Sequence, residues 1–417
     1  MKIPNKIEGL SEITDVYDGG GYAIAKDISG NLWSWGLNNC GQLGIGSTEE
    51  YVATPQQING LSGITDVYTD GYSVIVKNSS GNLWSWGSNS DGRLGIGSTE
   101  ECVTIPNKIE GLSGITDVYF GGGVFIIAKD TNGNLWSWGS NDEGQLGIGS
   151  TEEYVAIPNK IEGLSGVTNV YTNENTYYTI AKDSSGNLWS WGSNYNGRLG
   201  IGSTEGYVKI PNKIEGLSGI ADVYIGGSGN VIAKNNSGNL WSWGYNYNGI
   251  LGIGSTEEYV TTPQQINGLS GITDVYTNYN YYVIAKDSSG NLWSWGENYN
   301  GQLGIGSTEN KISPQKINGL SGITDVYMED AWVIAKDRNG NVWTWGSNEL
   351  GRLSIETESN LCTTPIKLND NENIAFYGKN IEELYVKDEQ ITAPIYNYIV
   401  KTSEGEWYSY RFYNQAV

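Results

Sequence analysis

The sequence NLWSWG at Asn31–Gly36 recurs almost unchanged along the chain. It returns at intervals of about 52 residues, and a fixed period of this size is the signature of a tandem-repeat architecture. The 417 residues are therefore interpreted as one repetitive array and not as several unrelated domains. The first tryptophan of each copy is Trp33, Trp84, Trp136, Trp189, Trp241, Trp293 or Trp343.

Each repeat predicts four short strands separated by turns rich in Gly, Asn and Ser. In the second repeat we expect them at Pro55–Ile58, Ile64–Tyr68, Val74–Lys77 and Leu83–Trp86, and we name them strands D, A, B and C. Side chains alternate between the two faces of a strand, so both tryptophans of strand C share one face. We predict that each pair packs between adjacent sheets.

An eighth, degenerate unit is predicted at about residues 365–417, with an insertion near Asn369–Lys379. Tyr408 and Tyr410 stand there in place of the tryptophan pair. The chain begins with a D strand at Ile3–Ile7 and ends with A, B and C strands near Ile381–Val386, Ile395–Lys401 and Trp407–Phe412. The first strand can thus complete the last sheet, which removes exposed sheet edges.

These features predict an all-β fold, a closed β-propeller of four-stranded antiparallel blades. Counting repeats gives eight blades, with seven as the alternative, and residues 1–417 form a single domain.

The chain is strongly acidic, with 46 Asp and Glu against 24 Lys and Arg and a formal net charge of −22. Such a surface repels nucleic acid and anionic lipid, and it attracts a basic protein patch. No stretch of 18 apolar residues occurs, so no membrane insertion is expected. The chain shows no signal peptide, which leaves the compartment open: cytoplasmic, or secreted or at the cell surface if a signal was removed.

Residues with chemistry for catalysis or metal binding are scarce. The absence of histidine removes the commonest general base and metal ligand. Cys40, Cys102 and Cys362 lie at three different phases of the repeat, so we expect three unpaired thiols and no zinc site. Asn89–Gly92 resembles the start of a calcium loop but lacks the distal glutamate. We therefore predict no cofactor, no metal and no enzyme activity.

The succession of WSWGSN, GQLGIG (Gly144–Gly149 in one copy), a strand led by proline, and IAKDSSGN resembles the regulator of chromosome condensation repeat family. The resemblance covers essentially the whole chain. It implies a propeller used as a protein-binding platform, normally with seven blades. The family includes a guanine-nucleotide exchange factor, a plant ultraviolet-B receptor and secreted bacterial inhibitors of β-lactamase.

The sequence departs from this family pattern at the start of strand B. Many family repeats carry histidine there, whereas this chain carries Tyr22, Ser73, Phe125, Tyr178, Asn230, Tyr282 and Trp332. An inserted hairpin of the exchange-factor kind and the GWRHT signature of the photoreceptor are also missing. These two activities are therefore not what the resemblance implies for this chain.

The repeats differ most in the loop between strands A and B and at the start of the loop between strands C and D. In an antiparallel blade both loops emerge on the same side, so the variable residues share one face. Aromatic residues with adaptable Gly and Asn neighbours favour recognition of a partner. The predicted partner-binding residues are Tyr22, Asp70, Tyr72, Phe120, Phe125, Glu174, Tyr177, Tyr178, Tyr195, Tyr247, Tyr279, Tyr281, Tyr282, Tyr299 and Trp332.

The same face carries repeated Ser-Thr-Glu loops, which would attract a basic patch on the partner. The glutamates are Glu49, Glu50, Glu100, Glu101, Glu152, Glu153, Glu205, Glu257, Glu258 and Glu309. We predict a monomeric, non-enzymatic scaffold for protein–protein recognition. A glycan-binding, lectin-like propeller and an exchange factor for a small GTPase are the alternatives. The Asn-, Tyr- and Ile-rich composition suggests a bacterial source.

Overall fold

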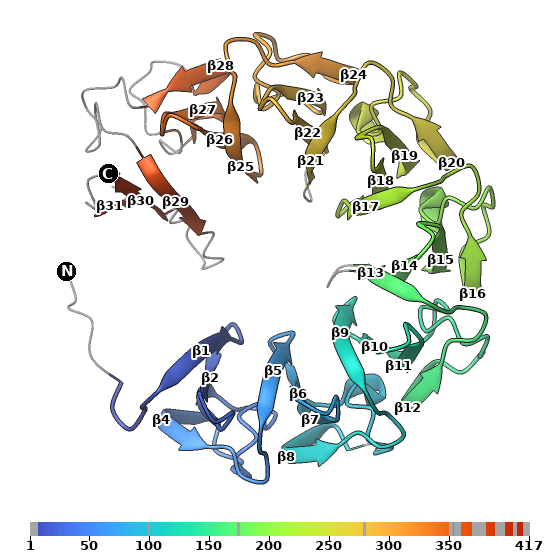
Figure 1. Cartoon of the computed structure of the whole chain (residues 1–417), viewed down its shortest axis with the longest axis vertical. Helices are drawn as coiled ribbons and strands as arrows, with labels where there is room; N and C mark the ends of the chain where they lie inside the picture. The colour runs from blue at the N-terminus through green and yellow to red at the C-terminus, as the bar shows by residue number, and fades with distance from the viewer. Residues whose placement is uncertain are drawn as a thin grey trace. The chain divides into compact units, whose positions relative to one another are not determined.

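The computed structural model describes residues 7–98, 100–172, 176–277, 281–349, 353, 360–368, 381–387, 397–402 and 407–411, the last three ranges as backbone only. Within these residues 31 strands form eight antiparallel sheets, of which seven have four strands and one has three (Figure 1). The all-β fold with four-stranded antiparallel blades is therefore confirmed. The strands of each sheet follow in chain order, and we keep the letters A, B, C and D for them.

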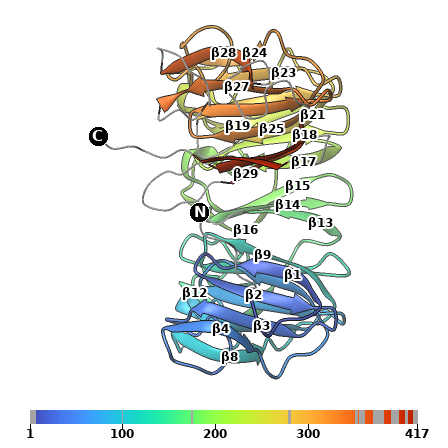
Figure 2. The same ribbon diagram turned by 90° about the vertical axis from the view of Figure 1, so that its left-hand side faces the viewer.

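The chain divides into two compact units, the first comprising Met1–Tyr195 and Glu205–Ile214. Its four sheets are β1 (Ile13–Asp18), β2 (Tyr22–Asp27), β3 (Leu32–Leu37) and β4 (Tyr51–Gln57); β5 (Ile64–Thr69), β6 (Ser73–Asn78), β7 (Leu83–Ser88) and β8 (Cys102–Lys108); β9 (Ile115–Gly121), β10 (Phe125–Asp130), β11 (Leu135–Ser140) and β12 (Tyr154–Lys160); and β13 (Val167–Tyr171), β14 (Tyr178–Asp183), β15 (Leu188–Ser193) and β16 (Tyr207–Lys213). Short 3-10 turns lie at η1 (Ser90–Gly92) and η2 (Tyr195–Gly197). Figure 2 shows the strands β1, β2, β3 and β4 of the first sheet side by side.

The second unit comprises Asn196–Thr204 and Glu215–Val417. Its four-stranded sheets are β17 (Ile220–Ile225), β18 (Asn230–Asn235), β19 (Leu240–Tyr245) and β20 (Tyr259–Gln265); β21 (Ile272–Thr277), β22 (Tyr282–Asp287), β23 (Leu292–Gly296) and β24 (Lys311–Lys316); and β25 (Ile323–Glu329), β26 (Trp332–Asp337), β27 (Val342–Ser347) and β28 (Leu361–Lys367). The turn η3 (Tyr247–Gly249) follows β19, and the three-stranded sheet contains β29 (Ile381–Lys387), β30 (Asn397–Thr402) and β31 (Trp407–Arg411).

The last sheet has the register expected of a degenerate repeat. Val400 pairs with Tyr408 and Tyr398 with Tyr410. Val283 and Ala285 pair in the same way with the tryptophans of β23. Tyr408 and Tyr410 therefore occupy the positions of the tryptophan pair. The N-terminal strand predicted to complete this sheet lies mostly outside the described residues, as does the insertion near Asn369–Lys379, so ring closure and the single-domain organisation stay predictions.

Strand D is longer than predicted because it starts well before its proline. In the first sheet β4 begins at Tyr51, which pairs with Leu37, and Val52 pairs with Gly36. The register then shifts before the Ser34–Gln56 pair. Pro55 lies in this irregular stretch of an edge strand, where its missing N–H costs no ladder hydrogen bond.

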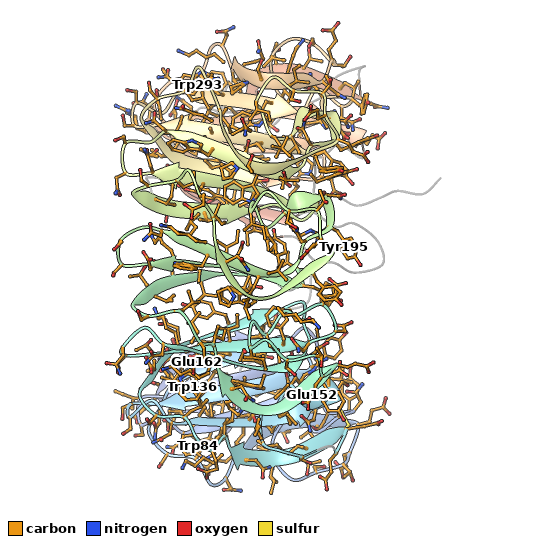
Figure 3. All side chains as sticks on the ribbon, turned by 90° about the vertical axis from the view of Figure 1, so that its right-hand side faces the viewer. Trp84, Trp136, Glu152, Glu162, Tyr195 and Trp293 are labelled. Carbon is orange, nitrogen blue, oxygen red and sulfur yellow. A yellow bond between two sulfur atoms is a disulfide. The ribbon has the colours of Figure 1, made fainter. Side chains whose placement is uncertain are left out.

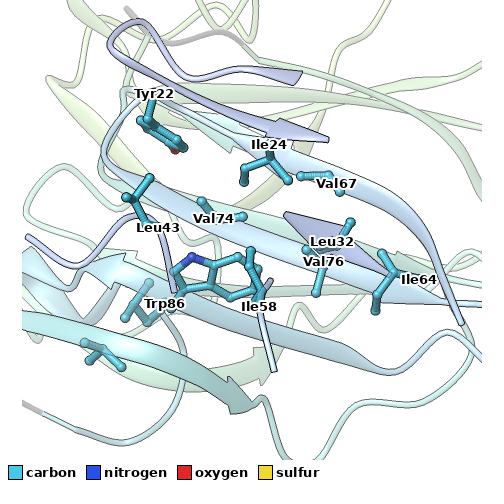
Figure 4. Close-up of a cluster of buried hydrophobic side chains, with 12 residues drawn as sticks. Tyr22, Ile24, Leu32, Leu43, Ile58, Ile64, Val67, Val74, Val76 and Trp86 are labelled. Atoms are coloured by element: carbon cyan, nitrogen blue, oxygen red, sulfur yellow. The ribbon is translucent and has the colours of Figure 1, made fainter. Parts of the chain in front are cut away.

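The core consists of layers between adjacent sheets. One layer joins Tyr22, Ile24 and Leu32 of the first sheet to Val74 and Trp86 of the second (Figure 4). From the second blade to the seventh the second tryptophan of the pair is fully buried in such a layer, whereas Trp35 of the first blade is half-buried. The Nε1 of Trp86 donates to the carbonyl of Gln42 in the preceding blade at 3.0 Å. The same bond recurs at Trp138, Trp191, Trp243, Trp295 and Trp345.

The first tryptophan of each pair is only half-buried, so the predicted packing between sheets is confirmed for the second tryptophan from the second blade to the seventh and is incomplete for the first tryptophan and for Trp35. Figure 3 shows Trp84 and Trp136 with Glu162 along one edge of the first unit, opposite Glu152 and Tyr195. We call the former edge the turn end, because it carries the turns between strands B and C, and the latter the loop end.

The turn end is built from the same contacts in successive blades. Asp27 accepts the backbone N–H groups of Ser29 and Asn31 and the side-chain amide of Asn31. Lys26 pairs with Asp15 at 3.1 Å and donates to the carbonyl of Thr65 in the next blade at 2.6 Å. A Cβ on Gly30 would lie 2.6 Å from the backbone nitrogen of Ile64, so only glycine lets the two blades approach this closely.

The expectation of three unpaired cysteines is wrong for two of them. Cys40, in the C–D loop of the first blade, forms a disulfide with Cys102 at the start of β8, with the Cα atoms 5.0 Å apart. Their phases in the repeat differ because the bond crosses from one blade to the next. The C–D loop lies against strand D of the following blade, as the hydrogen bond from Gly46 to the carbonyl of Thr104 also indicates. Cys362 is free and buried.

Candidate functional site at the loop end

The A–B and C–D loops of each blade meet at the loop end, as predicted. In the second blade the N–H of Ser88 donates to the carbonyl of Tyr72 at 3.0 Å, which ties the start of one loop to the end of the other. Gly87 precedes this contact with a φ of +98°, and a Cβ there would lie 2.6 Å from the same carbonyl. The glycine after the second tryptophan is thus needed for the two loops to join.

A single asparagine holds each described C–D loop in shape. Asn89 accepts the N–H of Leu94 at 3.1 Å and donates to the carbonyls of Ser98 and Glu100 at 3.0 and 2.9 Å. The equivalent Asn38, Asn141, Asn246 and Asn298 make the same three bonds. The loop backbone is therefore fixed, while all ten predicted acidic side chains of these loops are exposed.

The C–D loops fall into two types according to one residue. Where glutamine follows the loop glycine, as in Gln145, its side chain accepts the N–H of Glu143 at 2.8 Å and donates to Asp142 at 2.8 Å. Gln42 and Gln302 make equivalent bonds. Where arginine or isoleucine stands there, the loop forms a 3-10 turn in which Asp91, Asn196 and Asn248 have a positive φ.

Six of the predicted partner-binding residues are available at the surface. In the first unit, Tyr72, Tyr177 and Tyr195 are 67%, 40% and 55% exposed. In the second unit, Tyr247 and Tyr299 are exposed and Tyr281 is half-buried. Asp70 and Phe120 are also half-buried, and Glu174 and Tyr279 lie outside the described residues. The residue just before strand B reaches the surface, as in Tyr72 and Tyr177, whereas the first residue of strand B is buried. This difference accounts for most of which predicted residues are available to a partner.

The surface expectation is wrong for the five residues that begin strand B. Tyr22, Phe125, Tyr178, Tyr282 and Trp332 are buried. Tyr282 donates its hydroxyl to the carbonyl of Glu329 in the next blade at 2.9 Å, and Tyr22 makes the corresponding contact with Thr69. Burial raises the pKa of the Tyr282 hydroxyl well above its usual value. These side chains fill the layers between blades and present no surface.

Three tyrosines form a cluster at the loop end of the second unit. The rings of Tyr245 and Tyr247 stack with centroids 6.1 Å apart, and Tyr281 meets Tyr247 edge-on at 5.1 Å. Partial burial, together with Tyr281, Glu258 and Tyr247 nearby, raises the pKa of Tyr245. The carboxylate of Glu297 accepts the side-chain amide of Asn248 at 2.8 Å beside the cluster. We call Tyr245, Tyr247 and Tyr281 the tyrosine cluster.

The chemistry of the loop end favours binding. Among the described residues no three acidic or cysteine side chains converge on a possible metal position. In the part of the chain that the structure describes, no helix is long and apolar enough to cross a membrane.

Sequence reasoning left two contributors out of the predicted set, Tyr245 and Arg93. Arg93 carried a signal, because it stands where other repeats have glutamine.

Comparison with known proteins agrees with the repeat pattern. A family model described as the regulator of chromosome condensation (RCC1) repeat matches residues 29–71, 80–126, 132–172, 185–233, 237–280 and 289–328. The ultraviolet-B receptor UVR8 of Arabidopsis thaliana is 30% identical over 326 residues, which are 76% of this chain and 73% of the receptor. The E3 ubiquitin-protein ligase HERC2 of Mus musculus is 32% identical over 334 residues, which are 77% of this chain but only 7% of the ligase.

A solved structure shares the fold. The crystal structure of Kap60 bound to yeast RCC1 (Prp20) matches with a TM-score of 0.52 and 18% identity, covering 92% of this chain and 94% of that one. The seven four-stranded sheets fit the seven blades of the family fold, and the degenerate unit supplies the additional three-stranded sheet.

Proposed function

Because the chain belongs to the regulator of chromosome condensation (RCC1) repeat family, we propose that it is a non-enzymatic scaffold that binds a protein partner through its loop end. Proteins that share this repeat include a light receptor and a ligase, so the fold does not determine the function. The proposal therefore rests on the loop-end residues of this chain and on the kind of contact they can make.

The observation that carries the proposal is the tyrosine cluster. Rigid tyrosines offer large contact area at low cost in conformational entropy, and clustered aromatic residues are typical of binding hot spots. Asn246 fixes the backbone of the loop that carries Tyr245 and Tyr247, and the carbonyl of Tyr281 accepts the N–H of Glu297 at 2.7 Å, so little ordering is required when a partner binds.

The acidic loops give the proposed partner a charge. Glu258 lies close enough to Tyr245 to influence its pKa, and Glu257 beside it is exposed. Carboxylates around an aromatic patch raise the rate at which a basic surface associates with it. They slow dissociation less than the aromatic contacts do. We therefore propose a partner with a basic patch, bound by a monomer of this chain.

The test is affinity capture from extracts of the source cells with wild-type protein and with the Tyr247→Ala/Tyr281→Ala variant. Captured proteins are quantified by mass spectrometry at low and at physiological salt. The matched control is Tyr154→Ala, which removes an exposed tyrosine from the start of strand D in the first unit. We expect a partner that the control retains, the cluster variant loses, and higher salt weakens.

A partner retained equally by the cluster variant would contradict the proposed site. A glycan binder is the second candidate because the same exposed tyrosines could stack on sugar rings. Loss of glycan-array binding in the cluster variant, with no protein captured by wild type, would replace the proposal by that function. Stimulated nucleotide release from a small GTPase would instead support an exchange factor.

A further inference from the structure

A polar cavity lies between the second and third blades at the loop end of the first unit. Its volume is about 470 Å³, within the range of small-ligand sites. It is lined by Asp70, Tyr72, Ser88, Ser90, Arg93, Gly122, Gly123 and Val124. All three loops that form it come from the variable part of the repeat, so the cavity is not a general property of the blades.

Arg93 is the only cationic side chain of this lining, and it is more than nine-tenths buried. A guanidinium has five N–H donors. Nε donates to the carbonyl of Ser90 at 3.3 Å, and Nη1 to Oδ2 of Asp70 at 3.4 Å, both long for hydrogen bonds. Its Nη2 has no acceptor among the described residues. No nitrogen of Arg93 is among the fully enclosed side-chain atoms that lack a partner, so Nη2 is open to an acceptor from outside.

Asp70 forms a buried ion pair with Arg93, and its carboxylate is also held by other groups. Its Oδ1 accepts the N–H of Tyr72 at 2.9 Å, the N–H of Ser73 at 2.7 Å and the hydroxyl of Ser73 at 3.0 Å. Asp70 is therefore a fixed anchor of the A–B loop that orients Arg93. With its oxygens already engaged, Asp70 offers little to a cationic ligand.

Further donors surround the free side of Arg93. The hydroxyls of Ser88 and Ser90 lie 3.4 Å apart in the lining. The N–H groups of Gly122 and Gly123 donate to no acceptor among the described residues, and both glycines have a positive φ. A concave group of backbone N–H and hydroxyl donors around a guanidinium is suited to an oxyanion.

We infer that this cavity is a carboxylate-binding site in which Arg93 holds the two oxygens of the ligand side by side. A planar guanidinium matches a carboxylate through two parallel hydrogen bonds. The carboxylate can belong to a small organic acid or to the C-terminus of a protein partner. The repeat comparison separates the arginine repeats from the glutamine repeats. Gln145 at the same position of the third repeat turns back to bind its own loop, whereas Arg198 of the fourth repeat shares both the arginine and the 3-10 turn.

The first experiment measures binding of acetate and of a short peptide with a free C-terminus by saturation-transfer NMR. Its controls are the same peptide with an amidated C-terminus and inorganic phosphate. We expect the free carboxylates to bind competitively, and the amidated peptide to bind at least tenfold more weakly. Acetate that binds as well as the peptide indicates a small-acid site, whereas a peptide preference indicates a protein terminus. Phosphate binding as tight as that of acetate would overturn the carboxylate assignment.

Variants place the ligand in the cavity. Arg93→Gln introduces the residue of the first, third and sixth repeats and should weaken binding of acetate at least tenfold. The Asp70→Asn/Arg93→Gln variant avoids leaving an unpaired buried carboxylate and keeps the test valid if the single variant unfolds. Arg338→Gln removes the same charge from an exposed B–C turn and should bind as wild type does.

The last variant leaves Arg93 intact. Ser90→Tyr introduces the residue that the fourth, fifth and sixth repeats carry at this position, and η2 and η3 show that the 3-10 turn accepts it. Its ring should fill the cavity and abolish binding. Unchanged acetate binding in either the Arg93→Gln or the Ser90→Tyr variant would overturn the proposal. Because the tyrosine cluster is intact in all these variants, the partner capture of the proposed function is tested separately.

Discussion

The turn end and the loop end of the blades are made by the same strands but follow different rules. At the turn end, Lys26 of the first blade bonds to Asp15 and to the carbonyl of Thr65 in the next blade. Five further lysines repeat the ion pair with the aspartate of their own strand A. At the loop end different blades carry different features: a disulfide, a buried arginine and a tyrosine cluster.

The contrast between the two ends indicates where this fold tolerates substitutions. A turn-end side chain has several partners in two blades, so a substitution leaves polar groups without bonds. A loop-end side chain sits on a backbone that one asparagine already fixes, so its identity is free to vary. Variation among the repeats is therefore expected where new binding chemistry can appear without loss of the fold.

The largest expected effect concerns the boundary, within the loop end itself, between residues that the fold needs and residues that are free to vary. Tyr282 is buried and Tyr281, its neighbour, belongs to the tyrosine cluster. Tyr282→Ala should lower the free energy of unfolding by about 3–5 kcal/mol, because it leaves a cavity between two blades. Tyr281→Ala should cost less, about 0.5–1.5 kcal/mol, because it loses the edge-on contact with Tyr247 and part of its packing against the core. Urea unfolding of both variants measures the two free energies of unfolding. Equal losses would show that no such boundary separates the two residues.

The second prediction asks whether the loop end also contributes to stability. The Cys40–Cys102 bond closes a segment with a sequence separation of 62 between neighbouring blades. Its loss in Cys102→Ser should cost about 2–4 kcal/mol, mainly because the unfolded chain gains freedom. Cys40→Ser/Cys102→Ser should cost the same, and Cys102→Ser should be insensitive to reducing agents while wild type is not. Thermal unfolding with and without dithiothreitol decides this, and an unchanged melting temperature on reduction would show that the bond is absent or adds nothing.

The sequence predicts the strands well because the tryptophan pair and the glycine turns repeat in seven of the eight units. It does not predict the disulfide, since Cys40 and Cys102 meet only through the lateral contact of a C–D loop with the next strand D. A signal existed: Cys102 stands where four other repeats have tyrosine.

The sequence also leaves open which residue at the start of strand B is buried and which is exposed. Tyr177 and Tyr178, or Tyr281 and Tyr282, are identical neighbours, and only the exact first residue of the strand decides which one enters the core. The role of Arg93 does not follow from its own repeat, because it depends on a contact with Asp70, a residue of another loop. Contacts between repeats are therefore the part that the repeat pattern alone cannot supply.

The smallest expected effect concerns the acid sensitivity of the turn end. Burial, the largest single influence on Asp287, raises its pKa, but the hydrogen bonds from Asn291 and Ser289 outweigh it and hold the pKa below the usual value. Asp130 and Asp183 are shifted in the same direction for the same reasons. An aspartate whose pKa is lowered by folding stabilises the protein above its unfolded pKa, and this contribution is lost as the pH falls through the folded pKa.

The second and fifth repeats provide the natural control, because Asn78 and Asn235 accept the same backbone N–H groups without a charge. We expect Asp130→Asn/Asp183→Asn/Asp287→Asn to cost less than about 1 kcal/mol per turn at neutral pH, since these groups are half-buried and partly screened by solvent. Below about pH 4 the variant should lose less stability than wild type does. Melting temperatures between pH 3 and pH 7 test this, and parallel curves for the two proteins would mean that the acid sensitivity arises elsewhere, at the lysine-paired aspartates of strand A.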